Sequence, residues 1–282
     1  MGRLRKIQGY DVLAKLGNGA RSTIYAVKDG TNQVYALKHV VKEGPKDQRF
    51  LDQAILEHEV ASRLEHTNLR RSIKLIRKRK LLSTVEVFVL MEMVDGYTFE
   101  QYTPGSYIEF CRLLQQVTAG LQAMHDSGYV HADIKPNNIL ITNPDLIKII
   151  DLGQSCPIDT IKKRIQGTPD YIAPEQVRRK PITPVTDVFN LGATMYWLLT
   201  RRHVPTMIPK NGKEITKGSS KNTPPPAELN PNVPAALSTL VMDCVRRKPA
   251  ERPISMEIVG ERLTLAITQL ERDGSGPGPA AA

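Results

Sequence analysis

The pattern of hydrophobic residues changes near residue 95, and this change constrains the fold more than any other feature of the chain. Before it, short apolar or alternating runs predict β-strands, with one helical pattern among them from about residue 48 to residue 64. The strand-like runs are STIYAVKD (22–29), QVYALKHV (33–40) and VEVFVLMEM (85–93). The first part of the chain is therefore expected to be a small sheet with one helix.

Helical patterns dominate after residue 95. Apolar residues recur at helical spacing in three stretches, 107–128, 186–200 and 254–270. The proline-rich span TPPPAELNPNVP (223–234) is expected to be loop or extended chain, and the Gly/Pro/Ala-rich residues 271–282 are expected to be a flexible tail. Together these patterns predict an α+β fold with two lobes, at about 10–94 and 95–270.

The formal net charge of +10 favours acidic partners, whether nucleotide phosphates, acidic protein segments or nucleic acid. The densest basic cluster is RKRK (77–80), which follows Arg70, Arg71 and Lys74. A solvated hairpin is the first interpretation of this cluster. A docking surface for an acidic partner is the alternative.

Cysteine content and hydrophobicity indicate the cellular setting. The three cysteines, Cys111, Cys156 and Cys244, are spaced like neither a zinc site nor a disulfide framework. Each is expected to be a plain buried side chain in a reducing compartment. Because no apolar run reaches the length of a bilayer and residues 1–10 lack a signal-peptide core, a cytoplasmic protein without a membrane segment is expected.

A glycine-rich stretch, LGNGARSTIY (16–25), lies between two expected strands. Glycines at positions 17 and 19 allow backbone N–H groups to approach phosphate oxygens closely. The spacing alone is weak evidence, because a glycine-rich hairpin turn gives the same match. Neither a Walker sequence nor an immediate helix follows, which argues against a P-loop and against a dinucleotide fingerprint.

Lys38 lies on the next predicted strand, in the sequence YALKHV. A lysine among apolar residues is costly to leave unpaired, so Lys38 requires an anion and a carboxylate that holds it. The helical stretch ILEHEVASRL offers Glu57 as the first candidate and Glu59 as the second. A surface lysine on an edge strand would be the preferred interpretation if no other charged motif accompanied it.

The polar loop VHADIKPNNIL (130–140) supplies further charged and amide groups. Asp133 can accept the proton of an attacking hydroxyl, and Lys135 can neutralise a phosphate that is being transferred. Asn138, with Asp151 at the end of an aliphatic strand, offers oxygen ligands that suit magnesium. Each residue type thus meets one electrostatic need of phosphoryl transfer.

Taken in order over residues 10–270, these motifs resemble those of the eukaryotic-type (Hanks-type) serine/threonine protein kinase family. HAD stands where the family has HRD, DLG stands for DFG, and GTPDYIAPEQ (167–176) resembles the substrate-facing segment. Asp187 matches the aspartate that supports the catalytic loop, and Arg252 matches the arginine that pairs with the APE glutamate, Glu175. The sequences of these motifs resemble those of bacterial serine/threonine kinases most.

The resemblance implies a bilobal kinase fold, with residues 1–270 as the kinase domain, and it implies ATP, Mg²⁺ and protein substrates that bear serine or threonine. Asp133 would orient and deprotonate the substrate hydroxyl, while Lys135 would contact the γ-phosphate. Lys38, held by Glu57, would bind the α- and β-phosphates. The magnesium ligands that the resemblance implies are Asn138 and Asp151.

The resemblance also implies an adenine slot and a phosphate loop. Met91 would be the gatekeeper, and the Glu92 carbonyl and the Val94 amide would meet the adenine. Apolar walls around the base would come from both expected lobes. The residues implied to bind the nucleotide, besides Lys38, are Leu16, Gly17, Asn18, Gly19, Ala20, Arg21, Ser22, Ile24, Ala36, Met91, Glu92, Val94 and Leu140.

Three positions depart from the family pattern. Ser22 replaces the third glycine of the loop, and Leu152 replaces the DFG phenylalanine. Ala132 replaces an arginine that in the family pairs with a phosphate on the activation segment. The sequence therefore predicts a non-RD kinase that does not depend on phosphorylation between residues 151 and 175. The basic, proline-rich span 203–234 also differs from the substrate-docking helix expected there.

Other functions remain as alternatives. A nucleotide-binding pseudokinase or scaffold usually loses one of the catalytic charges, and none is lost in this chain. A kinase that acts on a small molecule would explain the missing arginine, but the intact segment at 167–176 argues against it. Nucleic-acid binding through the basic surface has no recognition motif and no interleaved aromatic residues to support it.

Overall fold

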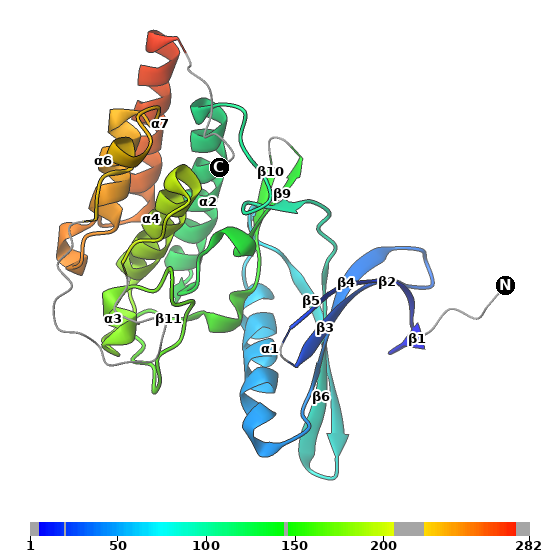
Figure 1. Cartoon of the computed structure of the whole chain (residues 1–282). Coiled ribbons are helices and arrows are strands. Elements are labelled where there is room, and N and C mark those ends of the chain that lie inside the picture. Colours follow the sequence, from blue (N-terminus) through cyan, green and yellow to red (C-terminus); the bar gives the residue numbers. More distant parts are fainter. Residues whose placement is uncertain (1–5, 20, 144–145, 206–222, 275–282) are drawn as a thin grey trace. The chain divides into compact units, whose positions relative to one another are not determined.

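The computed structural model describes residues 6–19, 21–143, 146–205 and 223–274 and divides into two compact units (Figure 1). The first unit comprises the chain up to Asp95 together with residues 151–153, and the second comprises the remainder. The main break follows Asp95, where the hydrophobic pattern changes from period 2 to helical spacing.

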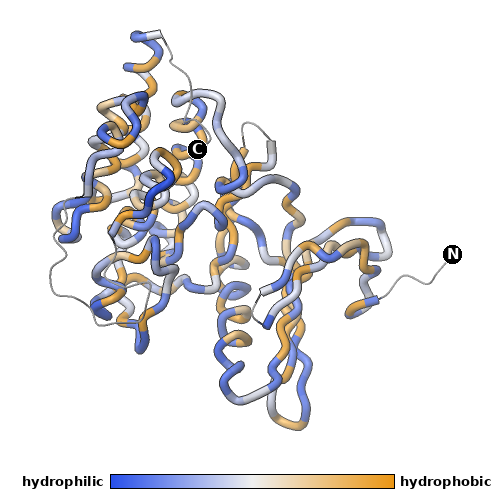
Figure 2. Tube along the Cα trace, in the orientation of Figure 1, coloured by the Kyte–Doolittle hydropathy of each residue, from blue (hydrophilic) through white to orange (hydrophobic). Residues whose placement is uncertain are grey.

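Among the described residues of the first unit, six antiparallel strands form one sheet in the order β1-β2-β3-β4-β6-β5. The three strand-like runs of the sequence become β3, β4 and β6, and β5 completes a hairpin with β6. The strands are β1 (Lys6–Ile7), β2 (Tyr10–Asn18), β3 (Ser22–Lys28), β4 (Val34–Val41), β5 (Ser72–Lys80) and β6 (Ser83–Glu92). Figure 2 shows that hydrophobic residues recur along these strands.

Helix α1 (Gln48–Ala61) follows the short 3₁₀ helix η1 (Pro45–Asp47) and packs against β4, β5 and β6. Leu51 and Ala54 of the helix join Val40 and Val89 of the sheet in one buried cluster. Leu37 belongs to a separate cluster, because neighbouring side chains of a strand point to opposite faces. Position 38 therefore lies on the face that α1 covers.

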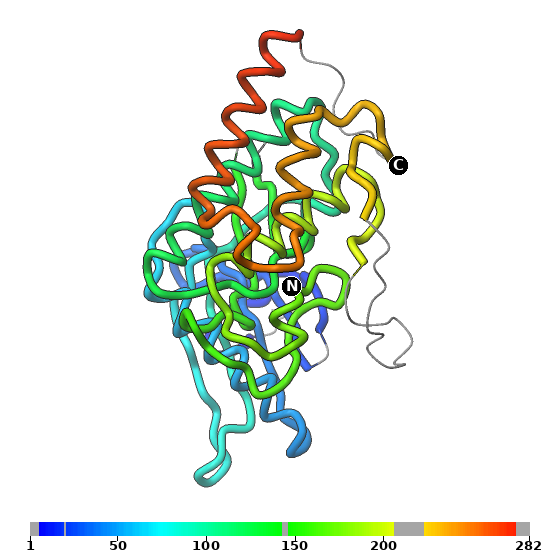
Figure 3. Tube along the Cα trace, turned by 90° about the vertical axis from the view of Figure 1, so that its left-hand side faces the viewer, coloured from blue at the N-terminus to red at the C-terminus, as the bar shows by residue number. Residues whose placement is uncertain are grey.

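Long helices form most of the second unit. Helix α2 (Tyr107–Asp126) packs against α7 (Met256–Asp273), and α4 (Pro184–Thr200) packs against α6 (Ala235–Cys244), which also contacts α7 (Figures 1 and 3). Ser106 and Ser255 cap α2 and α7 by accepting hydrogen bonds from the N–H groups three residues on. After α2 the chain turns at Gly128 with φ +84°, a conformation that glycine adopts without strain.

Short strands complete the second unit and carry the polar loop. β7 (Tyr97–Thr98), β9 (Ile139–Asn143) and β10 (Leu146–Ile149) form a three-stranded sheet, and β8 (Tyr129–Val130) pairs with β11 (Cys156–Pro157). The polar loop thus begins at the end of β8 and ends on β9, with the 3₁₀ helix η2 (Pro136–Asn138) within it. A second 3₁₀ helix, η3 (Leu152–Gln154), follows β10.

The structure corrects parts of the sequence analysis. The span 223–234 is not all loop, since Pro226–Leu229 form the short helix α5, in which proline occupies a first-turn position that needs no N–H donor. Helix α6 was missed because its nearly continuous apolar run follows several prolines. Helix α7 extends through Asp273, so residues 271–273 are helical rather than tail, with Glu271 3.5 Å from Arg112 on α2.

Some predictions fall outside the described residues: Ala20, much of the basic span 203–234 and the tail from 275 on. The three cysteines are free and buried, as predicted, and burial raises the pKa of Cys111 and of Cys244 to about 12. In the part of the chain that is described, no helix is both long enough and apolar enough to cross a bilayer.

Candidate active site

Lys38 on β4 lies in a cluster of charges within the first unit. Its Nζ atom is 2.6 Å from Oε2 of Glu57 and 3.7 Å from Oδ1 of Asp151. Glu57 lies on the face of α1 that packs on the sheet, and its side chain is buried. The alternative partner, Glu59, is exposed and lies 3.9 Å from Arg77. The rotation of α1 on the sheet thus selects Glu57.

Arg70 is the second cation on Glu57, with Nη2 3.0 Å from Oε1. The sequence analysis grouped Arg70 with a solvated basic cluster, but it is buried, because Glu57 offers it a desolvated carboxylate. Burial by itself would lower the pKa of Lys38, but the carboxylates of Glu57 and Asp151 raise its pKa above the ordinary value. Lys38 therefore remains a cation.

The glycine-rich stretch forms the turn between β2 and β3. The Gly19 amide donates to the Ser22 carbonyl at 2.7 Å, and a Cβ atom at position 19 would lie 2.6 Å from Oγ of Ser22. Arg21 forms ion pairs with Glu43 and, through Nε at 3.2 Å, with Asp47. The Arg21 side chain is thus directed to these two carboxylates.

The implied adenine-binding residues differ in burial. Ala36 and Met91 are buried and paired across β4 and β6, while Ile24 of β3 packs beside them. Leu16 is exposed, and Val94 is half-buried after the end of β6. Leu140 lies on β9 of the second unit, where it pairs with Thr98 of β7 and Lys148 of β10.

Asp187 at the start of α4 holds the polar loop. Its two carboxylate oxygens accept hydrogen bonds from the N–H groups of His131 and Ala132 at 2.8 and 2.7 Å, and His125 Nε2 lies 2.9 Å from Oδ2. Burial alone would raise the pKa of Asp187, but these partners hold it below the ordinary value. Ala132 takes φ +61°, a conformation that is strained for a residue with a Cβ. The buried Asp187 carboxylate thus stabilises a bend that the local sequence disfavours.

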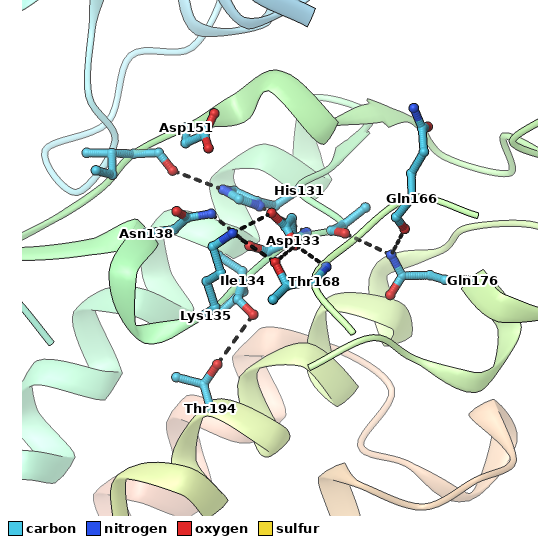
Figure 4. A network of polar contacts seen from close by, with 12 residues as sticks. His131, Asp133, Ile134, Lys135, Asn138, Asp151, Gln166, Thr168, Gln176 and Thr194 are labelled. Carbon is cyan, nitrogen blue, oxygen red and sulfur yellow. Dashed lines mark hydrogen bonds and ion pairs between the residues drawn. The ribbon is translucent and has the colours of Figure 1, made fainter. Parts of the chain in front are cut away.

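Asp133, Lys135 and Thr168 converge in the second unit (Figure 4). Oδ1 of Asp133 accepts from both the N–H and the Oγ1 of Thr168 at 2.8 Å. Lys135 Nζ lies 3.1 Å from Oδ2 of Asp133 and donates to Thr168 Oγ1 at 2.8 Å. The result is a carboxylate fixed in orientation beside an ammonium group, the combination required to accept a proton next to a transferred anion.

Asn138 presents one free oxygen. Its Nδ2 donates to the Asp133 carbonyl at 2.9 Å, and its backbone carbonyl accepts from Ile150 N–H at 2.9 Å. Its side-chain Oδ1 has no hydrogen-bond partner within the described residues. Asp151, directly after Ile150, takes φ +63° and directs a carboxylate out of the strand end. An amide oxygen and a carboxylate oxygen are each hard ligands of the kind that Mg²⁺ prefers.

Besides the contacts of Thr168, the segment 154–175 has an internal contact through Lys162 and accepts a hydrogen bond from Gln176 at the Gln166 carbonyl. Lys162 donates to the Gln154 carbonyl at 2.5 Å, and burial lowers the pKa of Lys162 although Asp133 and Asp187 attract its proton. Gln176 Nε2 donates to the Ala132 carbonyl at 2.8 Å.

Sequence reasoning assigned no role to Lys162 and did not predict the contact between Thr168 and Asp133. Lys162 lies among other basic residues of the segment, and nothing in its local sequence distinguishes it from exposed Lys163. The double contact between Thr168 and Asp133 joins residues far apart in the chain. In contrast, the pairing of Arg252 with Glu175 follows the family resemblance, with guanidinium nitrogens 2.6 and 2.9 Å from the carboxylate oxygens.

The sequence matches known proteins over most of its length. A family model described as "Protein kinase domain" matches residues 10–263. The chain is 27% identical over 252 residues to a probable serine/threonine-protein kinase of Clostridium acetobutylicum, an alignment that covers 86% of this chain and 37% of that protein. Over 262 residues it is 27% identical to the serine/threonine-protein kinase PrkC of Bacillus subtilis, covering 88% and 39%. The chain thus spans well under half of these relatives.

A eukaryotic relative matches over a shorter region. The chain is 34% identical over 202 residues to calcium/calmodulin-dependent protein kinase type 1 of Caenorhabditis elegans. That alignment covers 67% of this chain and 56% of the relative. The chain is therefore similar to both bacterial and animal protein kinases.

Proposed function

Because the chain belongs to the protein kinase domain family, we propose that it transfers the γ-phosphate of Mg-ATP to serine and threonine hydroxyls of proteins. Members of the family use ATP and usually a divalent metal ion. The observation that carries the proposal is Asp133, whose carboxylate is oriented by Thr168 and lies 3.1 Å from the ammonium group of Lys135. The names of the bacterial relatives, which are serine/threonine-protein kinases, support serine and threonine as the acceptors.

Each residue then has one role in the reaction. Asp133 orients the substrate hydroxyl and accepts its proton, and Lys135 stabilises the negative charge that develops on the transferred phosphoryl group. Lys38, kept protonated and in place by Glu57, binds the α- and β-phosphates. The backbone amides of the turn between β2 and β3 cover the phosphates, while Arg21 keeps its side chain on Asp47.

Asn138 and Asp151 would hold the metal through Oδ1 and a carboxylate oxygen. When bound, the metal supplies positive charge against the β- and γ-phosphate oxygens. The hydrogen bond from Asn138 Nδ2 to the Asp133 carbonyl fixes which atom of the amide is offered. Met91, Ile24 and Ala36 supply apolar surface for the base, and Leu16, Val94 and Leu140 are proposed to add to it.

The transfer assay tests the proposal. The chain is incubated with Mg-ATP labelled at the γ-phosphate and a generic basic protein, beside the variant Lys38→Met. We expect label on serine and threonine with the unmodified chain, and a fall of at least about 10²-fold with Lys38→Met, because the phosphates lose their cation. Absence of transfer combined with ATP-induced thermal stabilisation would favour the pseudokinase instead.

We also propose that the enzyme is of the non-RD type and needs no phosphate on the segment 154–175. Ala132 offers no guanidinium to a phosphate, and the segment is held without one by the contacts of Thr168, Lys162 and Gln176. The available hydroxyls are poorly placed for modification, since Ser155 is buried and Thr168 is bonded to Asp133. Thr160 donates to the Pro157 carbonyl at 2.6 Å.

Phosphatase treatment checks this regulatory proposal. The dephosphorylated chain is expected to keep its initial rate of transfer in an assay too short for autophosphorylation. Lys162→Gln is expected to lower kcat roughly tenfold or more at unchanged KM for ATP, because small displacements of a catalytic group are costly. The matched control is Lys163→Gln, which removes the neighbouring, exposed lysine. Loss of nearly all activity on dephosphorylation, with recovery on autophosphorylation, would contradict the proposal.

A further inference from the structure

The tip of the β5–β6 hairpin is exposed and hydrophobic at its end. Leu81 and Leu82 are 94% and 98% exposed and form the two-residue loop between the paired residues Lys80 and Ser83. All residues from 77 to 83 are exposed. In Figure 2 the tip of this hairpin is a hydrophobic turn at the far end of the strands.

The hairpin extends past the rest of its sheet. β4 pairs with β6 only between Glu86 and Glu92, and the last contact from that side is the Lys42 amide on the Val85 carbonyl at 2.9 Å. Beyond this point β5 and β6 pair with each other alone. The tip therefore contributes nothing to either hydrophobic cluster of the unit.

The backbone of the loop is also unfavourable for leucine. Leu81 has φ +54°, in the region that two-residue hairpin loops normally fill with glycine, asparagine or aspartate. A leucine in this place is strained, and its apolar side chain is left in water. Neither turn formation nor packing against the described residues accounts for the two leucines, and this favours an interaction outside the chain.

Basic residues surround the leucines. From residue 74 to residue 86 there are five lysines and arginines, against Glu86 as the only acid, and these sum to +4. Lys78 pairs with Glu86 at 2.6 Å, and Arg77 lies near Glu59. Among the described residues no carboxylate pairs with Lys74, Arg79 or Lys80. Basic residues on an edge strand prevent edge-to-edge pairing, but this explains the charges of β5 and not the leucines.

We propose that this hairpin tip is a peripheral membrane-contact site for bilayers that contain anionic phospholipids. Leu81 and Leu82 enter the interface, and Arg79 and Lys80 lie against the lipid phosphates. A protein partner is disfavoured because a specific protein interface buries roughly 800 Å² on each side, far more than a two-residue tip presents. A fluid apolar layer beneath an anionic surface needs no shaped pocket. The site is independent of the kinase activity proposed above.

Cosedimentation of the full chain with vesicles tests the site. The probes are phosphatidylcholine vesicles with and without phosphatidylserine, at low and physiological salt. Binding is expected only with phosphatidylserine. Leu81→Asn/Leu82→Gly is expected to lower the partition roughly tenfold or more, since both apolar side chains are lost. The same variant is expected to keep or raise the unfolding temperature, because Asn-Gly suits the turn.

Matched variants separate the site from general surface effects. Arg79→Gln/Lys80→Gln is expected to lower partition roughly tenfold, as each basic residue near an anionic surface contributes to binding. Ile254→Ser removes another exposed apolar side chain, and Lys46→Gln/Arg247→Gln removes two other exposed charges. Both controls are expected to bind as the unmodified chain does.

Three results would overturn the proposal. The first is no sedimentation of the unmodified chain with phosphatidylserine vesicles at either salt concentration. The second is undiminished vesicle binding by Leu81→Asn/Leu82→Gly, which would show that the binding depends on charge alone and not on the leucines. The third is leucine-dependent binding to polyglutamate or to an oligonucleotide without binding to vesicles, which would assign the tip to an acidic macromolecule.

Discussion

Asp133→Asn is expected to lower kcat for transfer to a protein substrate by about 10²- to 10⁴-fold, the range for loss of a general base. Asparagine has the same shape, so its Oδ1 can still accept from Thr168 N–H and Oγ1, both at 2.8 Å in the unmodified chain. It cannot take the proton of the substrate hydroxyl, and its amide replaces the oxygen that lies 3.1 Å from Lys135. The KM for ATP should change little, because the residues proposed to bind the nucleotide are others.

The measurement is the initial rate at saturating Mg-ATP, accompanied by the rise in unfolding temperature that ATP causes. The matched control is Asp126→Asn, at the end of α2, where the carboxylate accepts only from Gln122 in the described part of the chain. That variant should match the unmodified chain in both assays. Asp133 would be excluded as the base if the Asp133→Asn variant kept the normal nucleotide-induced stabilisation and more than about a third of the normal rate.

Arg252→Met is expected to destabilise the chain by about 3–5 kcal/mol, the range for breaking a buried ion pair. The Arg252 side chain is 0% exposed, and its guanidinium lies 2.6 Å from Glu175, which is 6% exposed. The same side chain donates to the Val185 and Arg246 carbonyls at 2.8 Å and lies over the ring of Phe189. Methionine fills part of the volume but leaves a buried carboxylate without its counter-charge.

Urea unfolding measures the change, and two further variants interpret it. Arg112→Met removes an exposed pair with Glu271, at 3.5 Å and with side chains 64% and 52% exposed, and should cost less than about 1 kcal/mol. Arg252→Met/Glu175→Gln should recover part of the loss, because the orphaned charge is gone. Equal, small effects of Arg252→Met and Arg112→Met would show that the buried pair contributes no more than a surface pair.

The local features of this chain were predictable because they depend on residues a few positions apart. The period-2 runs became β3, β4 and β6, and the helical patterns became α1, α2, α4 and α7. Helix α6 and the short α5 escaped prediction, since apolar runs and prolines fit both loop and helix when no tertiary context is given. The family resemblance added the motif residues in order, including those far apart in the chain.

The tertiary structure decided which distant groups meet. Glu57 rather than Glu59 pairs with Lys38, and the buried Arg70 pairs with the same Glu57 carboxylate. Both pairings depend on how α1 is rotated about its axis where it packs on the sheet. Thr168 orients Asp133 although the two residues are 35 positions apart in the sequence. Sequence by itself determined the elements and the reactive residue types, which are local chemistry. The pairing of charges required burial, because only desolvated neighbours fix which carboxylate holds which cation.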